Sequence, residues 1–142
     1  MLPIRRTVAP IRVLVIDDDP LVGNILLRAL VPTFDVDFEE DPLQALATLL
    51  DDPPYYDVVL SDVQMPAVSG PEILSVLRRA HSPVAGRFVF MTAANVSDFP
   101  GCAQTFGRPI LRKPVSLMEL VRVLRTVARG EVALEAQSAI TS

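Results

Sequence analysis

Three aspartates directly follow short apolar segments, at positions where a charged side chain is unusual. Asp17 and Asp18 follow the run at 12–16, and Asp62 follows the run at 57–61. If these runs are neighbouring parallel strands, their carboxyl ends meet at one edge of the sheet and the three carboxylates converge. Their mutual repulsion is costly, and a divalent cation relieves it. Ligation by oxygen atoms, with few protein groups, favours Mg²⁺.

Two further polar residues follow apolar runs in the same way. Thr92 comes behind the run at 87–91, and Lys113 comes behind the run at 109–112. A lysine supplies a compact positive charge for a phosphoryl oxygen, and a threonine supplies a hydroxyl donor. With the aspartates, these residues predict a site of three carboxylates, a hydroxyl and an ammonium group.

Strands and helices alternate along the chain and would position this site. Short β-branched and apolar stretches predict five strands, at 12–16, 35–39, 57–61, 87–91 and 109–112. Helix-starting signals predict four helices, beginning at Pro20, Pro42, Pro71 and Ser116. Residues 95–107 hold the place of a further helix, which Pro100-Gly101 would leave short or irregular. The alternation predicts an α/β fold with a parallel sheet and helices on both faces.

The helices also carry signals for their caps and their buried sides. Asp19 and Asp41 precede prolines and are expected to cap the first two helices, and Ser116 with Glu119 predicts a capping box. Apolar residues at helical spacing predict the inward faces, which are Leu21, Val22, Ile25, Leu26, Ala29 and Leu30 in the first helix, Leu43, Leu46, Ala47 and Leu50 in the second, Ile73, Leu74, Val76 and Leu77 in the third, and Leu117, Leu120, Val121 and Leu124 in the last.

Composition and charge exclude several classes of protein. The 142 residues are 50% hydrophobic and 21% charged, which is typical of one folded domain; 11–130 would form it, with extensions at 1–10 and 131–142. No apolar run approaches a membrane span and no signal peptide is evident, so we expect a soluble, cytoplasmic protein. The single cysteine, Cys102, excludes an internal disulfide and a multi-cysteine zinc site, and the single histidine, His81, excludes His-pair metal motifs. The net charge of −4 argues against nucleic-acid binding.

Five motifs in order resemble the receiver domain of two-component response regulators, the CheY-like family. They are Val13 to Pro20 (VLVIDDDP), Asp57 to Pro66 (DVVLSDVQMP), Gly70, Met91 to Ala94 (MTAA) and Lys113-Pro114. The resemblance covers residues 11 to about 130. It implies a flavodoxin-like three-layer sandwich, whose five-stranded parallel sheet has the order 2-1-3-4-5.

The resemblance also implies a role for each residue of the site. Asp62 would be the phosphoacceptor, taking its phosphoryl group from a histidine kinase or a phosphotransfer protein. Mg²⁺ would be held by Asp18, Asp62 and the main-chain carbonyl of Gln64, and by Asp17 chiefly through a water molecule. Lys113 would neutralise the phosphoryl oxygens, and Thr92 would bond to one of them after transfer. Such a protein catalyses only its own phosphorylation and dephosphorylation and signals to a downstream protein by contact.

The sequence departs from the family at the position three residues before the lysine. The family has an aromatic switch residue there, whereas this chain has Ile110, so the conventional aromatic switch is not expected. The family favours a cis bond at Lys113-Pro114, and it tunes dephosphorylation at the positions of Gln64 and Ala94. The stretch 106–114 is similar to receivers carried by hybrid histidine kinases.

Other interpretations remain open at this stage. Asp17-Asp18-Asp19 contains the Asp-x-Asp motif of haloacid-dehalogenase-type phosphatases, but Pro20 stands where those enzymes usually have glycine and Asp62 would have no role. A receiver that binds a partner without phosphorylation is a second alternative. The chain could be a stand-alone regulator or a receiver from a larger kinase or transcription factor. His81 is interpreted as a solvated loop residue and not as a phosphohistidine.

Overall fold

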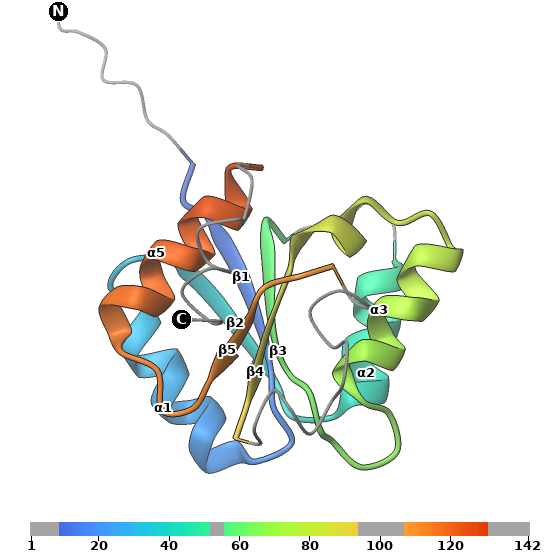
Figure 1. The fold of residues 1–142 in the computed structure, drawn as a ribbon, viewed down its shortest axis with the longest axis horizontal. Coiled ribbons are helices and arrows are strands. Elements are labelled where there is room, and N and C mark those ends of the chain that lie inside the picture. The colour runs from blue at the N-terminus through green and yellow to red at the C-terminus, as the bar shows by residue number, and fades with distance from the viewer. Residues whose placement is uncertain (1–8, 52–55, 94–106, 131–142) are drawn as a thin grey trace, which may run out of the picture.

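The computed structural model describes residues 9–51, 56–93 and 107–130 and contains one parallel sheet. Its five strands are β1 (Arg12–Ile16), β2 (Asp35–Glu39), β3 (Val58–Asp62), β4 (Phe88–Thr92) and β5 (Ile110–Arg112). They lie in the order β2-β1-β3-β4-β5 (Figure 1), which confirms the predicted topology. β3 and β4 lie one residue later than predicted, so Asp62 and Thr92 are the last residues of their strands.

Helices cover both faces of this sheet and complete the predicted three-layer sandwich. They are α1 (Pro20–Leu30), α2 (Pro42–Leu50), α3 (Gly70–Arg79) and α5 (Leu117–Ala128), with a 3₁₀ helix at Pro83–Arg87. α1 and α5 lie on one side of the sheet and α2 and α3 on the other (Figure 1). Each side has its own apolar core. None of the described helices is long and apolar enough to cross a membrane. The predicted irregular helix at 95–107, apart from Gly107, lies outside the described residues, as do Ala94 and Cys102.

The prediction of the buried helix faces was largely correct for α3 and largely wrong for α2, where only Leu46 of the four predicted residues packs against the core. α3 buries Ile73, Leu74 and Leu77, as expected. α2 instead buries Pro42, Ala45 and Leu49. Leu43 and Leu50, predicted to face inward, are 54% and 46% exposed. Because α2 has apolar side chains around most of its circumference, its periodicity does not define one inward face.

Single positions of α1 and α5 were also predicted wrongly. Leu21 and Ile25 of α1 and Leu117 of α5 are exposed, whereas Leu120 and Leu124 are buried as expected. Leu21 and Leu117 lie in the first turn of their helices, and Ile25 lies in the second turn of α1.

The capping signals were read correctly at α1 and α2, only in part at α5, and not at all at α3. The side chains of Asp19 and Asp41 accept hydrogen bonds from main-chain N–H groups of α1 and α2. Ser116 accepts one from Glu119, but the reciprocal bond that would complete a capping box is not formed in α5. The complete box, which the sequence analysis missed, joins Ser69 and Glu72 at the start of α3.

α3 ends in a left-handed turn at His81, and this turn makes a testable prediction about stability. His81 has a φ of 57°, and the N–H of Ser82 donates to the carbonyl of Leu77 at 3.0 Å. Glycine is favoured at such a position because it has no Cβ to clash with the following carbonyl. We expect His81→Gly to raise the free energy of unfolding by about 1 kcal/mol, measured by chemical denaturation. His81→Ala, which keeps the Cβ, should give no such gain; a loss of stability in the glycine variant would contradict the prediction.

Candidate functional site

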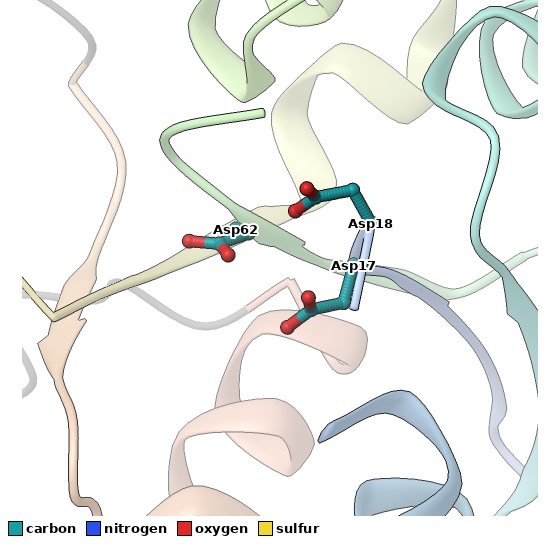
Figure 2. Close-up of side chains that lie close together, drawn as sticks. All are labelled: Asp17, Asp18 and Asp62. Carbon is teal, nitrogen blue, oxygen red and sulfur yellow. The ribbon is translucent and has the colours of Figure 1, made fainter. Parts of the chain in front are cut away.

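The three predicted aspartates meet at the carboxyl edge of the sheet, where β1 and β3 are paired. Ile16 lies opposite Ser61 in this pairing, which brings Asp17 and Asp62 to the same level. One carboxylate oxygen from each of Asp17, Asp18 and Asp62 lies within 4.8 Å of the others. Figure 2 shows the three side chains gathered at these strand ends. The structure therefore brings together the carboxylates that the sequence analysis proposed.

Lys113 adds an ammonium group to this cluster. Its Nζ lies 3.3 Å from Oδ2 of Asp62 and 3.4 Å from Oδ2 of Asp17. Its main-chain N–H donates to the carbonyl of Thr92 at 2.8 Å, so the pairing of β4 and β5 continues to the lysine itself. Lys113 is the only lysine in the chain. The pairing of β5 with β4 thus fixes the position of the lysine, whose ammonium lies between two carboxylates.

The environment of Asp62 makes its negative charge costly. Its side chain is 13% exposed, and that of Asp17 only 2%. Burial raises the pKa of the Asp62 carboxyl above its ordinary value, attraction by the Lys113 ammonium opposes this rise, and repulsion by Asp17 adds to it. The Asp17 carboxylate is held in place because its Oδ1 accepts the N–H of Asp19 at 2.9 Å. An added cation at this edge would relieve the repulsion that one ammonium leaves uncompensated.

The groups present fit a Mg²⁺ ion. They offer oxygen atoms alone, from three carboxylates that are close together and only partly balanced by Lys113. Gln64 lies two residues beyond Asp62, in the connection to α3, and its side chain is exposed. Hard oxygen ligands and a remaining opening to solvent suit an ion that retains water molecules.

The other predicted features lie at the positions that the resemblance implied. Thr92 is the last residue of β4 and is 2% exposed; Met91 pairs with Asp62, so Thr92 lies one residue further along the same edge. The Lys113-Pro114 bond is cis. Ile110 is fully buried and pairs with Phe90 of β4, so it belongs to the core. His81 is exposed at the far end of α3 from the aspartates, in agreement with its interpretation as a loop residue.

Two residues that contact the main chain of Asp62 were not singled out for this contact in the sequence. Ser61 is fully buried, and its Oγ donates to the main-chain carbonyl of Asp62 at 2.9 Å. Gly70, noted only as part of a motif, lies so close that a Cβ on it would be 2.4 Å from the same carbonyl oxygen. The only sequence signal for Ser61 was a hydroxyl inside an otherwise apolar strand. The contact of Gly70 with the Asp62 carbonyl could be recognised only once the fold was known.

Sequence comparison links the chain to one family. Residues 13–125 match the family described as response regulator receiver domain. The transcriptional regulatory protein TrcR of Mycobacterium tuberculosis is 36% identical over 129 residues, which cover 89% of this chain and 49% of TrcR. The transcriptional activator protein IrlR of Burkholderia pseudomallei is 32% identical over 127 residues, covering 87% and 53%. The chain thus spans about half the length of these curated relatives.

Solved structures show the same architecture. The receiver domain of the putative response regulator NarL from Mycobacterium tuberculosis matches with a TM-score of 0.74 at 27% identity, covering 86% of this chain and 98% of that one. The chemotaxis protein CheY4 of Vibrio cholerae matches with a TM-score of 0.70 at 24% identity, covering 84% and 99%, and supports the fold alone. With the family match and the observed strand order, these likenesses show that the chain belongs to the response regulator receiver domains of two-component systems.

Proposed function

We propose that this receiver accepts a phosphoryl group on Asp62 in the presence of Mg²⁺ and signals by contact with another protein. The observation that carries the proposal is the arrangement of Asp62, Asp17 and Lys113, in which the ammonium lies within 3.4 Å of both carboxylates. Receiver domains are signalling modules and not classical enzymes, so the transferred group stays on the protein and changes the protein itself.

The residues present can be assigned to the steps of an in-line phosphoryl transfer. A carboxylate oxygen of Asp62 attacks the phosphorus of a phosphohistidine, an O–P bond forms, and the P–N bond breaks. The imidazole of the donor leaves with the electron pair of that bond and takes up a proton. The ammonium of Lys113 neutralises charge on the phosphoryl oxygens, and the Thr92 hydroxyl donates to one of them afterwards. Positioning and charge neutralisation do most of the work in such reactions.

Mg²⁺ would be held by the carboxylates of Asp18 and Asp62 and by the main-chain carbonyl of Gln64, with Asp17 acting chiefly through a bound water. When bound, the ion supplies positive charge for the transferred group. The proximity of the three carboxylates and the raised pKa of Asp62 support this assignment.

The donor in this proposal is a histidine kinase or a phosphotransfer protein, and the receiver acts in the cytoplasm on a downstream protein. We propose no nucleic-acid contact by this domain itself, because its net charge of −4 disfavours binding to a polyanion. TrcR and IrlR are named as transcriptional regulators, so a receiver of this kind can also act within a longer protein that controls transcription. A receiver within a hybrid kinase is the alternative context that the stretch 106–114 favours.

Intact mass spectrometry tests the proposal directly. The protein is incubated with acetyl phosphate and Mg²⁺, and we expect the mass to increase by one phosphoryl group. Asp62→Asn, or removal of Mg²⁺ with a chelator, should abolish the increase because the nucleophile or its counter-charge is lost. Asp51→Asn is the matched control, because Asp51 is an exposed aspartate at the end of α2.

Two results would contradict the proposal. An adduct retained in Asp62→Asn would mean that another residue accepts the group. No adduct from acetyl phosphate or from a phosphorylated histidine phosphotransfer protein, together with no Mg²⁺ binding, would favour the phosphorylation-independent alternative. Turnover of a phosphomonoester substrate would instead favour the phosphatase alternative.

A further inference from the structure

Ser61 places a hydroxyl group next to the apolar core on the α2 and α3 side of the sheet. Among the described residues, the buried polar or charged side chains are Asp17, Thr92 and Ser61, and the proposed reaction uses only the first two. Ser61 shares its face of β3 with Val59 and lies on the side of the sheet that α2 and α3 cover. A buried hydroxyl costs free energy unless it is hydrogen-bonded, so its single bond is the feature to be explained.

That bond holds the main chain of the phosphoacceptor. The Oγ of Ser61 donates to the carbonyl oxygen of Asp62 at 2.9 Å, which fixes the peptide group between Asp62 and Val63. The N–H of Val63 donates to the carbonyl of Met91, and its carbonyl accepts the N–H of Gly70, each at 3.0 Å. Three consecutive main-chain groups are therefore tied at the point where β3 ends, immediately before Gln64.

The start of α3 leaves no room for a water molecule to take over the hydrogen bond from Ser61 to the Asp62 carbonyl. A Cβ on Gly70 would lie 2.8 Å from Oγ of Ser61, so the helix packs directly over the hydroxyl. Removing the hydroxyl would free the volume of one oxygen atom, which is less room than a water molecule takes. The carbonyl of Asp62 would then lose its donor, or the segment after Asp62 would shift to find another.

We infer that Ser61 is a positioning residue, which sets the orientation of the Asp62 carboxylate and of the Gln64 carbonyl through the peptide group that follows Asp62. This inference rests on the proposed function, because it concerns the geometry of phosphoryl acceptance and Mg²⁺ binding. Residues that orient metal ligands and nucleophiles change affinity or rate by about 10- to 100-fold when they are replaced.

The experiment compares Ser61→Ala with Val59→Ala, which removes apolar volume from the same face of the same strand. Phosphorylation by acetyl phosphate is followed at a temperature at which both variants are folded, and Mg²⁺ affinity is measured by calorimetry. We expect Ser61→Ala to lower the rate constant and the Mg²⁺ affinity by roughly 10-fold or more. Val59→Ala should lose at least as much stability, since it creates a cavity, but it should leave rate and affinity within about twofold.

The outcomes separate this inference from the proposed function. If the wild-type protein is phosphorylated and binds Mg²⁺ but Ser61→Ala does both equally well, Ser61 only fills the core and the inference is overturned. If Val59→Ala loses as much rate and affinity as Ser61→Ala, the effect is one of general stability, which also overturns it. If the wild-type protein neither accepts a phosphoryl group nor binds Mg²⁺, the proposed function fails and the positioning role fails with it.

Discussion

Gly70→Ala should be among the most damaging single substitutions at the edge of this site. The added Cβ would lie 2.4 Å from the carbonyl oxygen of Asp62, 2.8 Å from Oγ of Ser61 and 2.9 Å from the ring of Phe90. Two of these neighbours belong to or bond to the main chain and cannot rotate away, so α3 must move off β3. We expect the free energy of unfolding to fall by about 3 kcal/mol. The rate of phosphorylation should fall by roughly 10-fold or more, because the main chain of Asp62 shifts when α3 moves.

Gly86→Ala is the matched control for this substitution. Gly86 lies in the 3₁₀ helix before β4, and a Cβ there would meet nothing within 4 Å. Its free energy of unfolding should stay within about 0.5 kcal/mol of the wild type, as for most surface substitutions. Urea denaturation of both variants, with the phosphorylation assay, measures the two effects. Equal stability of Gly70→Ala and wild type would mean that α3 and β3 do not pack as closely as described.

Lys113→Ala should separate phosphoryl transfer from metal binding. The ammonium lies 3.3 Å and 3.4 Å from oxygens of Asp62 and Asp17, two of the three carboxylates that could hold a cation. In the proposed function its loss would remove the charge that stabilises the transferred phosphoryl oxygens, so the rate should fall by roughly 100- to 1000-fold. Mg²⁺ should nevertheless bind several-fold more tightly, because a positive charge that repels the ion and competes for the carboxylates is gone.

The control for this variant removes the same charge from the neighbouring position. Arg112 is exposed at the end of β5, so Arg112→Ala should leave transfer and Mg²⁺ affinity nearly unchanged. Mass spectrometry measures the transfer rate and calorimetry the affinity. Parallel weakening of both in Lys113→Ala would show that the lysine supports the structure of the site and does not compete with the ion.

The fold could be predicted from the sequence because its signals are local. Short apolar strands, aspartate-proline helix starts and acidic strand ends each depend on a few adjacent residues, and the strand order followed from the family resemblance. The buried face of α2 could not be predicted in this way. With leucines at 43, 46, 49 and 50 and alanines at 45 and 47, several helix faces are apolar, and contact with the rest of the protein decides which is covered.

The charged groups of the site could also be predicted, because their signals are local in the sequence. The residues that fix the main chain around them could not. Asp17, Asp18, Asp62 and Lys113 are conspicuous because each charge directly follows a buried strand. Ser61 looks like any polar residue near a strand end, and its bond to the next residue's carbonyl can be recognised only from coordinates. The close approach of Gly70 likewise depends on how α3 returns across β3. Such contacts between main-chain and small side-chain atoms leave little trace in residue type.

The single lysine gives this protein a built-in spectroscopic reporter. Since Lys113 is the only lysine of the chain, growth on ¹⁵N-lysine would label one main-chain amide. That N–H donates to the carbonyl of Thr92 at 2.8 Å, at the end of the β4–β5 pairing. The nitrogen–proton correlation spectrum should contain one lysine amide signal, whose position follows any movement of the threonine. Occupancy of the site could then be followed without introducing a tag or a mutation.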